Sequence, residues 1–117
     1  MEAQITTRMN PLVLRDYLVE AYDLDPALQL KRLTAEEKGR IKVSLRMVYG
    51  GPSHLGVEHD LDARELAQAV LPELLEIHEV PPHTEVLSVT LLSGPWLEVS
   101  ARWTPVNTLN PTAKPKP

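Results

Sequence analysis

Apolar and polar residues alternate most clearly over residues 41–49. The apolar positions of this stretch are Ile41, Val43, Leu45, Met47 and Tyr49, and the polar positions between them are Lys42, Ser44 and Arg46. Successive side chains of a strand point to opposite faces of its sheet. The pattern therefore predicts a strand with one buried face and one solvated, basic face. We expect the protein to function through the basic face.

The spacing of apolar residues predicts a helix over residues 11–22, after an N-cap residue, Asn10, and a proline suited to the first turn. Its apolar face is formed by Val13, Leu14, Tyr17 and Leu18. The pair Asp25-Pro26 repeats this start pattern and predicts a second helical segment over residues 26–33. The leucines of that segment are Leu28, Leu30 and Leu33.

The longest predicted helix covers residues 62–77. It begins with the capping-box pattern Asp62-Ala63-Arg64-Glu65, in which the side chain of the first residue accepts a hydrogen bond from the backbone of the fourth. Its apolar stripe consists of Leu66, Val70, Leu74 and Ile77, thickened by Leu71 and Leu75. Pro72 lies inside this stretch and predicts a kink. A similar pattern at residues 34–37 predicts a short helical turn that Gly39 ends.

The remaining periodic stretches predict strands. Their ranges are 4–9, 53–60, 84–93 and 96–103, and the turns that separate strands are Gly50-Gly51-Pro52 and Gly94-Pro95. The predicted order is β-α-β-β-α-β-β. This order indicates an α+β fold, a two-layer sandwich in which helices cover one face of a mostly antiparallel sheet. We assign residues 1–104 to a single domain and interpret the proline-rich residues 105–117 as a disordered tail or a docking segment.

Composition narrows the class of protein. The 117 residues suit one domain with one core, and 43% hydrophobic with 24% charged residues is typical of a folded chain. The net charge of −4 argues against a protein coated in positive charge. With no cysteine, disulfides, thiol catalysis and cysteine metal sites are excluded. The N-terminus lacks a signal-peptide pattern, and no apolar run approaches the roughly 20 residues that span a bilayer. We expect a cytoplasmic protein without a membrane partner.

The polar positions of the predicted strands are rich in hydroxyl and basic side chains. They are Gln4, Thr6, Arg8, Lys42, Ser44, Arg46, Ser88, Thr90, Glu98, Ser100 and Arg102. The acidic residues gather instead on the predicted helices and at their starts. Serine, threonine, lysine and arginine are the residues that bind phosphate oxygens. This arrangement predicts a basic sheet face and acidic helices, although exposed strands of any protein favour the same polar residues.

Over about residues 3–94 this chain resembles a known protein family. The segments that carry the resemblance are Lys42-Val43-Ser44-Leu45-Arg46-Met47-Val48-Tyr49, Asp62-Ala63-Arg64-Glu65-Leu66 and the passage from Pro81 to Gly94. Together they resemble the little-finger domain of Y-family translesion DNA polymerases, here standing alone. In that family a β-α-β-β-α-β unit lays its open sheet along the DNA backbone. The resemblance implies that Thr6, Arg8, Lys42, Ser44, Arg46, Ser88 and Thr90 face DNA.

Histidines and tryptophans provide the other candidate residues. The histidines are His54, His59, His78 and His83. Because their spacing matches no metal motif, we expect surface or loop histidines, no metal and no cofactor. Trp96 and Trp103 point to opposite faces of one predicted strand. Trp103 alternates with core residues, whereas Trp96 is either an exposed anchor for a partner or packed at the rim of the sheet.

Three functions remain open from the sequence. The leading hypothesis is a non-enzymatic module that binds the backbone of duplex or primer-template DNA in repair or replication, with Arg102 beside the family-matched residues. The second is a structural or interaction subunit, of a phage particle or a repair assembly, that docks onto protein or onto its own copies through a sheet edge, Trp96 and the tail. The third is an enzyme that uses histidine and carboxylates.

Overall fold

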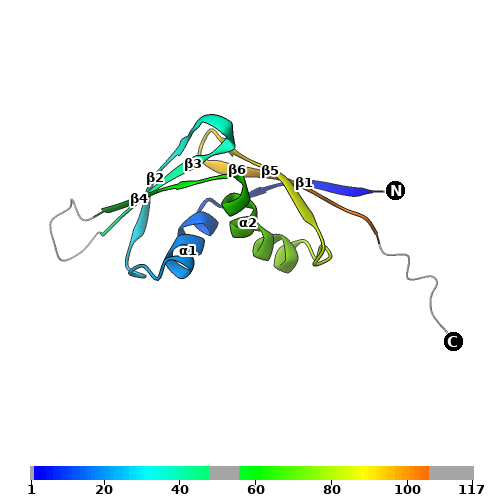
Figure 1. Cartoon of the computed structure of the whole chain (residues 1–117), viewed down its shortest axis with the longest axis horizontal. Helices are drawn as coiled ribbons and strands as arrows, with labels where there is room; N and C mark the ends of the chain where they lie inside the picture. The colour runs from blue at the N-terminus through cyan, green and yellow to red at the C-terminus, as the bar shows by residue number, and fades with distance from the viewer. Residues whose placement is uncertain (1, 48–55, 106–117) are drawn as a thin grey trace.

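The computed structural model describes residues 2–47 and 56–105. Within them the chain forms two α-helices, one short 3-10 helix and six strands. In chain order these are β1 (Ala3–Met9), α1 (Leu12–Ala21), β2 (Gln29–Ala35), η1 (Glu37–Gly39), β3 (Ile41–Arg46), β4 (Gly56–Leu61), α2 (Ala63–Ile77), β5 (Glu85–Leu92) and β6 (Trp96–Trp103). The predicted α+β class with antiparallel strands is confirmed, and both helices lie on the same side of the strands (Figure 1).

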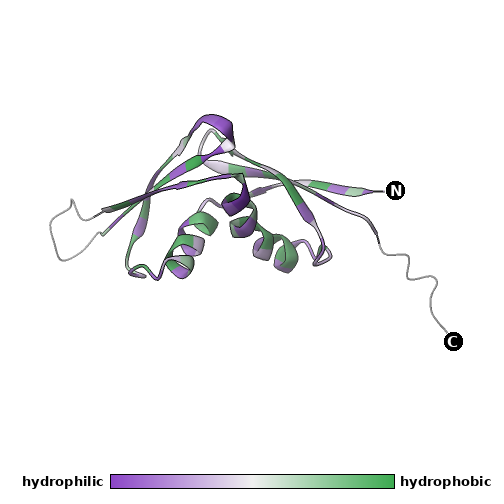
Figure 2. Ribbon diagram, in the orientation of Figure 1, coloured by the Kyte–Doolittle hydropathy of each residue, from purple (hydrophilic) through white to green (hydrophobic). Residues whose placement is uncertain are grey.

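The strands form two antiparallel sheets of three. We call β1-β6-β5 the terminal sheet and β2-β3-β4 the central sheet. The two sheets meet where edge strands β2 and β5 approach each other. Each sheet turns one face toward the helices, which we call its inner face, and its outer face away from them. Apolar and polar residues alternate along the predicted strands of both sheets, while β2, which was not predicted as a strand, interrupts the alternation at a bulge (Figure 2).

A single hydrophobic core joins the inner faces to the helices. The central sheet contributes Ile41, Val43, Leu45 and Leu61, the terminal sheet Met9, Leu97, Val99 and Ala101, and the helices Leu14, Leu18, Leu66, Val70 and Leu74. Burial of large aliphatic side chains is the main force that holds such a layer together. In the described part of the chain, this core places both α-helices against the inner faces and no α-helix on the outer ones.

The predicted helix over residues 26–33 is wrong, because most of this segment is strand β2. A β-bulge at Lys31 shifts the pairing of β2 with β3 between Leu30 and Arg32. The extra residue puts Leu30 and Leu33, three apart, on the same inner face. A spacing of three is also the spacing of a helix face, so the bulge produced a helical pattern in a strand.

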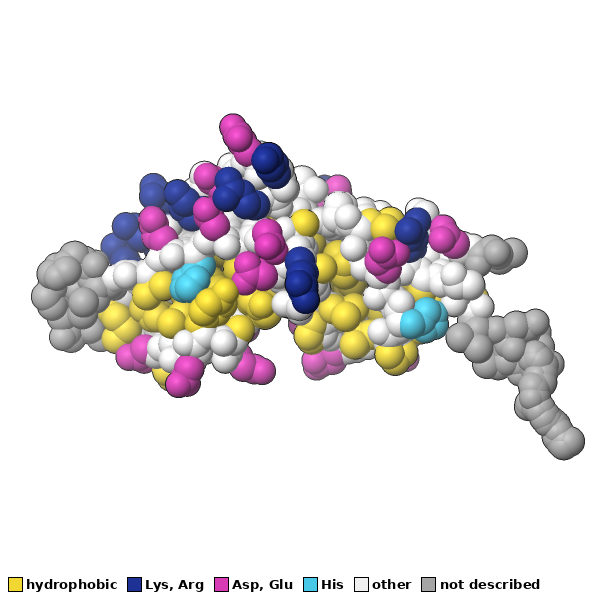
Figure 3. Space-filling view, viewed as in Figure 1, with side chains coloured by type: hydrophobic (Ala, Val, Ile, Leu, Met, Phe, Trp, Pro, Cys, Tyr) yellow, Lys and Arg dark blue, Asp and Glu magenta, His cyan; other side chains and the backbone are white. Residues whose placement is uncertain are grey.

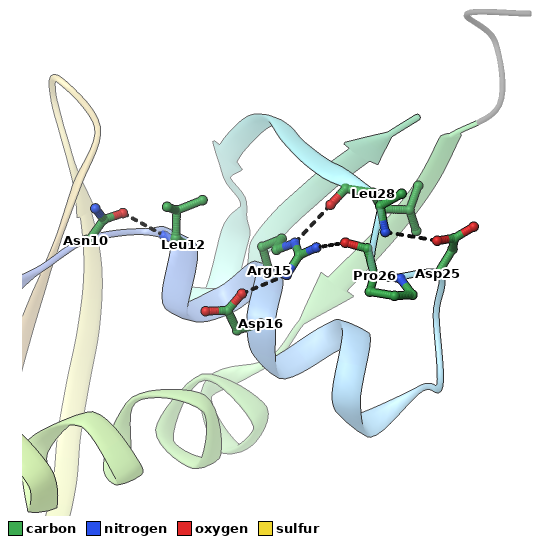
Figure 4. Close-up of polar contacts among 8 residues, drawn as sticks. Asn10, Leu12, Arg15, Asp16, Asp25, Pro26 and Leu28 are labelled. Carbon is green, nitrogen blue, oxygen red and sulfur yellow. Dashed lines mark hydrogen bonds and ion pairs between the residues drawn. The ribbon is translucent and has the colours of Figure 1, made fainter. Parts of the chain in front are cut away.

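The start of this segment is a turn fixed by side chains (Figure 4). Asp25 accepts a hydrogen bond from the backbone N–H of Ala27 over 2.9 Å, so the aspartate caps a turn instead of a helix. Arg15 of α1 donates to the backbone carbonyl of Leu28 over 2.9 Å and also to that of Pro26. These contacts tie α1 to the chain that enters β2.

Helix α2 begins where the capping box predicted. Asp62 accepts a hydrogen bond from the backbone N–H of Glu65 over 2.9 Å and satisfies one of the free donors of the first turn. The prediction that Ile77 belongs to the buried stripe is wrong, since this side chain is 59% exposed at the last residue of the helix. Helix α1 buries Leu14 and Leu18 as predicted.

Several sequence predictions lie outside the described residues. They concern the last part of the strand predicted over 41–49, the turn at Gly50-Gly51-Pro52, and the proline-rich tail from residue 106 onward. Within the described residues, β3 ends at Arg46, and β4 is its antiparallel partner, as predicted.

Candidate nucleic-acid interface

The outer face of the central sheet gathers positively charged side chains from three neighbouring segments. Lys42 and Arg46 come from β3, and in the adjacent strand β2, Arg32 lies opposite Ser44. Lys31 is the bulge residue of β2 and lines the same hollow as Ser44 and Arg46. We call this surface the basic face. Its charged residues are Lys31, Arg32, Glu36, Arg40, Lys42, Arg46, Glu58 and Asp60.

Positive charge exceeds negative charge among these residues, with five cationic side chains against three carboxylates. Asp60 forms an ion pair with Arg40 over 3.5 Å, and Glu58 accepts a hydrogen bond from Ser44 over 3.1 Å. Among the described residues of this face, positive charges therefore outnumber carboxylates by two. Lysine and arginine side chains gather over this part of the molecule, with a few acids among them (Figure 3).

The outer face of the terminal sheet carries the other residues that the sequence proposed for DNA contact. Its cross-strand rows are Gln4-Arg102-Glu85, Thr6-Ser100-Ser88 and Arg8-Glu98-Thr90. Arg102 pairs with Glu85 over 3.0 Å and with Glu2 over 3.9 Å. Arg8 lies opposite Glu98, so each arginine of this face has a carboxylate partner or neighbour.

The predicted site is therefore divided between the two sheets. Thr6, Arg8, Ser88, Thr90 and Arg102 lie on the terminal sheet, and Lys42, Ser44 and Arg46 on the central sheet. All eight are on outer faces, as the alternation predicted. The prediction that Ser44 is solvated is wrong: only 6% of it is exposed, because β3 is the middle strand and long side chains on both neighbouring strands flank the serine.

Sequence reasoning missed Lys31, Arg32 and Arg40. The first two fell in the segment assigned to a helix, where their position on a sheet face was invisible. The adjacent pair Lys31-Arg32 between two leucines was the available indication, because a bulge allows both neighbours to reach one face. Arg40 directly precedes the first residue of β3, and its side chain forms an ion pair with Asp60 of β4.

The helix side of the molecule is acidic. A groove of about 380 Å³ lies between α1 and α2, and four carboxylates line it: Asp16, Glu20, Glu73 and Glu76. Within residues 2–47 and 56–105, no group of histidine and acidic side chains is arranged to hold a metal ion. The predicted separation of charge is present between the helices and the central sheet, whereas the terminal sheet does not share in it.

A polar cluster between the helices and β4 bears on the enzyme hypothesis. Tyr22 donates a hydrogen bond to Glu65 over 2.7 Å, and its ring lies 4.5 Å from that of His59. This hydrogen bond, followed by burial and by the charge of Glu65, raises the pKa of Tyr22. Burial, with the charges of Glu65 and Asp62, raises the pKa of Tyr17 as well. A raised pKa keeps a phenol protonated, which is opposite to what a tyrosine base or nucleophile requires.

The histidines described by the structure have structural contacts. His59 belongs to the inner face of β4 and packs on Tyr22 while staying partly exposed, so it lies in a strand and not in a loop. His78 lies within hydrogen-bond distance of the Thr7 hydroxyl, 3.2 Å away, and His83 within 2.8 Å of the Thr104 carbonyl. His54 lies outside the described residues.

Exposed apolar residues on the terminal sheet are the candidates for protein docking. Trp96 is 44% exposed at the turn end of β6, and Leu87 is 45% exposed at the bulge of β5. Trp103 packs against the core, as predicted. Trp96 pairs with Leu92, five residues along β5 from Leu87, so the two exposed side chains do not form one continuous apolar patch.

Comparison with protein-family models, curated proteins and solved structures finds no match to this chain. No helix in the described part of the chain is long and apolar enough to cross a membrane. The resemblance to a little-finger domain stays a prediction.

Proposed function

We propose that this protein is a non-enzymatic module that binds the phosphate backbone of nucleic acid through the basic face of its central sheet. The observation that carries the proposal is the excess of positive charge on a helix-free sheet face in a chain with a net charge of −4. Cations released from the nucleic acid supply most of the affinity in such binding, which is therefore steeply dependent on salt and indifferent to sequence.

The shape of the face supports the same proposal. An uncovered sheet presents its charges as a broad surface, and β2, β3 and β4 hold them in rows about 4.8 Å apart, the usual distance between neighbouring strands. Arginine and lysine side chains are long enough to follow a backbone without reading bases. The acidic helices on the other side of the molecule favour approach with the sheet toward nucleic acid. The DNA repair or replication role implied by the little-finger resemblance, and a cytoplasmic location, belong to this proposal.

Fluorescence-anisotropy titration of the full chain with a short labelled primer-template duplex tests the proposal. We expect binding at low salt and a slope of log affinity against log salt of about −3 to −4, if three or four phosphates are contacted. Removing two contacts with Lys42→Ala and Arg46→Ala should weaken binding about tenfold and reduce the slope by about 2.

The matched control removes the same number of charges from the terminal sheet. Arg8→Ala with Arg102→Ala should weaken binding less than about twofold, because both arginines lie beside carboxylates. Equal losses from the two double variants would show that net charge alone matters. No binding at low salt would refute the proposal and favour a protein-docking subunit, for which Trp96→Ala in a measurement of assembly mass is the next experiment.

A further inference from the structure

A hollow of about 250 Å³ opens on the basic face at one end of the central sheet. Its lining is Lys31, Ser44, Leu45, Arg46, Gly56, Val57 and Glu58. Two of these side chains are cationic, one is a hydroxyl and one is a carboxylate. The hollow therefore brings together the donors that bind a phosphate and a single acid that opposes one.

Two local features make the hollow. The bulge in β2 inserts Lys31 as an extra residue between Leu30 and Arg32, and a bulge redirects the side chain it carries. On the other side of β3, the residue opposite Arg46 is Gly56, which has no side chain. Among the described residues, β4 therefore places no side chain opposite Arg46.

Ser44 and Glu58 occupy the floor and wall of the hollow. Ser44 is 6% exposed, and its hydroxyl donates to Oε2 of Glu58 over 3.1 Å. An anionic oxygen is thus already bound to a buried donor in a hollow that two cationic side chains also line. The carboxylate stands where a phosphate oxygen of a ligand would make the same contact.

We propose that this hollow is a seat for one phosphate group and that Glu58 is its internal competitor. The inference rests on the proposed function, and it names the contact point and the source of selectivity within it. A free phosphate ion has to displace Glu58 with only the binding free energy that this one site provides. A polyanion already held by Arg32 and Lys42 meets the seat at a high effective concentration and displaces the carboxylate more easily. Glu58 therefore makes the seat selective for a phosphate group of a polyanion over a free phosphate ion.

The first test compares two carboxylate variants of β4 by anisotropy with the labelled duplex. Glu58→Gln should tighten binding about five- to tenfold, because it removes a negative charge from the seat and frees the Ser44 hydroxyl. Asp60→Asn, on the same strand and face but outside the hollow, should tighten it only about twofold, because it frees the exposed ion-pair partner Arg40 and leaves the hollow unchanged. Adding Ser44→Ala to Glu58→Gln should remove most of the gain, while thermal melting confirms that each variant is folded.

The second test adds inorganic phosphate as a competitor at constant ionic strength. We expect phosphate to displace the duplex from the Glu58→Gln variant at concentrations that leave native protein and the Asp60→Asn variant bound. Equal gains in Glu58→Gln and Asp60→Asn, or equal competition in all three proteins, would overturn the seat while native duplex binding kept the proposed function. Absence of native binding at low salt would refute the proposed function, and the seat with it.

Discussion

The terminal and central sheets are built alike, yet their outer faces differ in charge. Each has three antiparallel strands, and each has an edge strand with a bulge, in β5 between Val86 and Ser88 and in β2 between Leu30 and Arg32. Both inner faces pack on the same helices and belong to the same core. The bulge residue of the terminal sheet is an exposed leucine, whereas that of the central sheet is a lysine.

Cross-strand neighbours account for the difference in charge. On the terminal sheet Arg102 pairs with Glu85, and Arg8 lies opposite Glu98. On the central sheet Lys42 likewise lies opposite Asp60, but the neighbours of Arg46 are Gln29 and Gly56, neither of them charged. The same alternation of polar residues along a strand therefore gives a neutral face or a basic one, depending on the strands beside it. Four predictions test or sharpen this contrast.

The largest effect is expected where the two sheets are alike, in the shared core. Leu45→Ala in the central sheet and Leu97→Ala in the terminal sheet, both fully buried, should each lower the free energy of unfolding by about 2–5 kcal/mol. Urea denaturation should show a single transition in both variants, since one core joins the sheets. The exposed Leu87→Ala is the control, with a change within about 0.5 kcal/mol. Separate transitions would mean that the sheets unfold independently.

Exchange of the two bulge residues should move charge from one sheet to the other. A chain with Lys31→Leu and Leu87→Lys keeps its net charge, but it should bind the duplex about threefold to tenfold more weakly, because the transferred lysine leaves the group of cations that acts together. Anisotropy titration at low salt measures the loss. Unchanged affinity would show that the position of the charge is irrelevant and that the two outer faces are equivalent.

Removal of the carboxylates from the terminal sheet should make the two faces more alike. The pair Glu85→Gln and Glu98→Gln takes away the partner of Arg102 and the acid opposite Arg8. We expect duplex affinity to rise about twofold to threefold, and the salt slope to steepen by less than 1, because only two arginines become available. The same anisotropy titration provides the measurement, and a gain larger than that of Glu58→Gln would place the main interface on the terminal sheet.

The smallest effect is expected for the pKa of Tyr22, which follows helix α1 on the inner side of the central sheet. Tyr22 has a raised pKa, chiefly because its hydroxyl donates to Glu65. A raised pKa in the folded protein means that the protonated phenol adds stability below the unfolded pKa near 10, and that this stability is lost as the pH rises through the folded pKa. Glu65→Gln should lower the pKa of Tyr22 in a tyrosinate absorbance titration, with Tyr22→Phe identifying its signal. An unchanged pKa would contradict the hydrogen bond.

Patterns within single segments of the sequence were sufficient to predict most of the helices and strands. Strand β6 follows from alternation with the bounds predicted, and the start of α2 follows from the capping box at Asp62. These features depend on residues a few positions apart, whose side chains interact within one element. The inner and outer faces of β3 were predictable for the same reason, so Lys42 and Arg46 were found in advance.

The pairing of strands was decided only by the tertiary structure. A bulge exists only relative to a partner strand, so the leucines at 30 and 33 predicted a helix until β3 fixed their register. The burial of Ser44, the neutralisation of Arg102 and the hollow beside Gly56 likewise depend on neighbours 14 to 17 residues away or on an adjacent strand. Alternation along the chain was enough to show which residues of β1, β3, β5 and β6 face outward, but not which residues of β2 do so. Only the arrangement of strands determined which of their charges remain available to bind a ligand, because a charge is available only where its cross-strand neighbours leave it unbalanced.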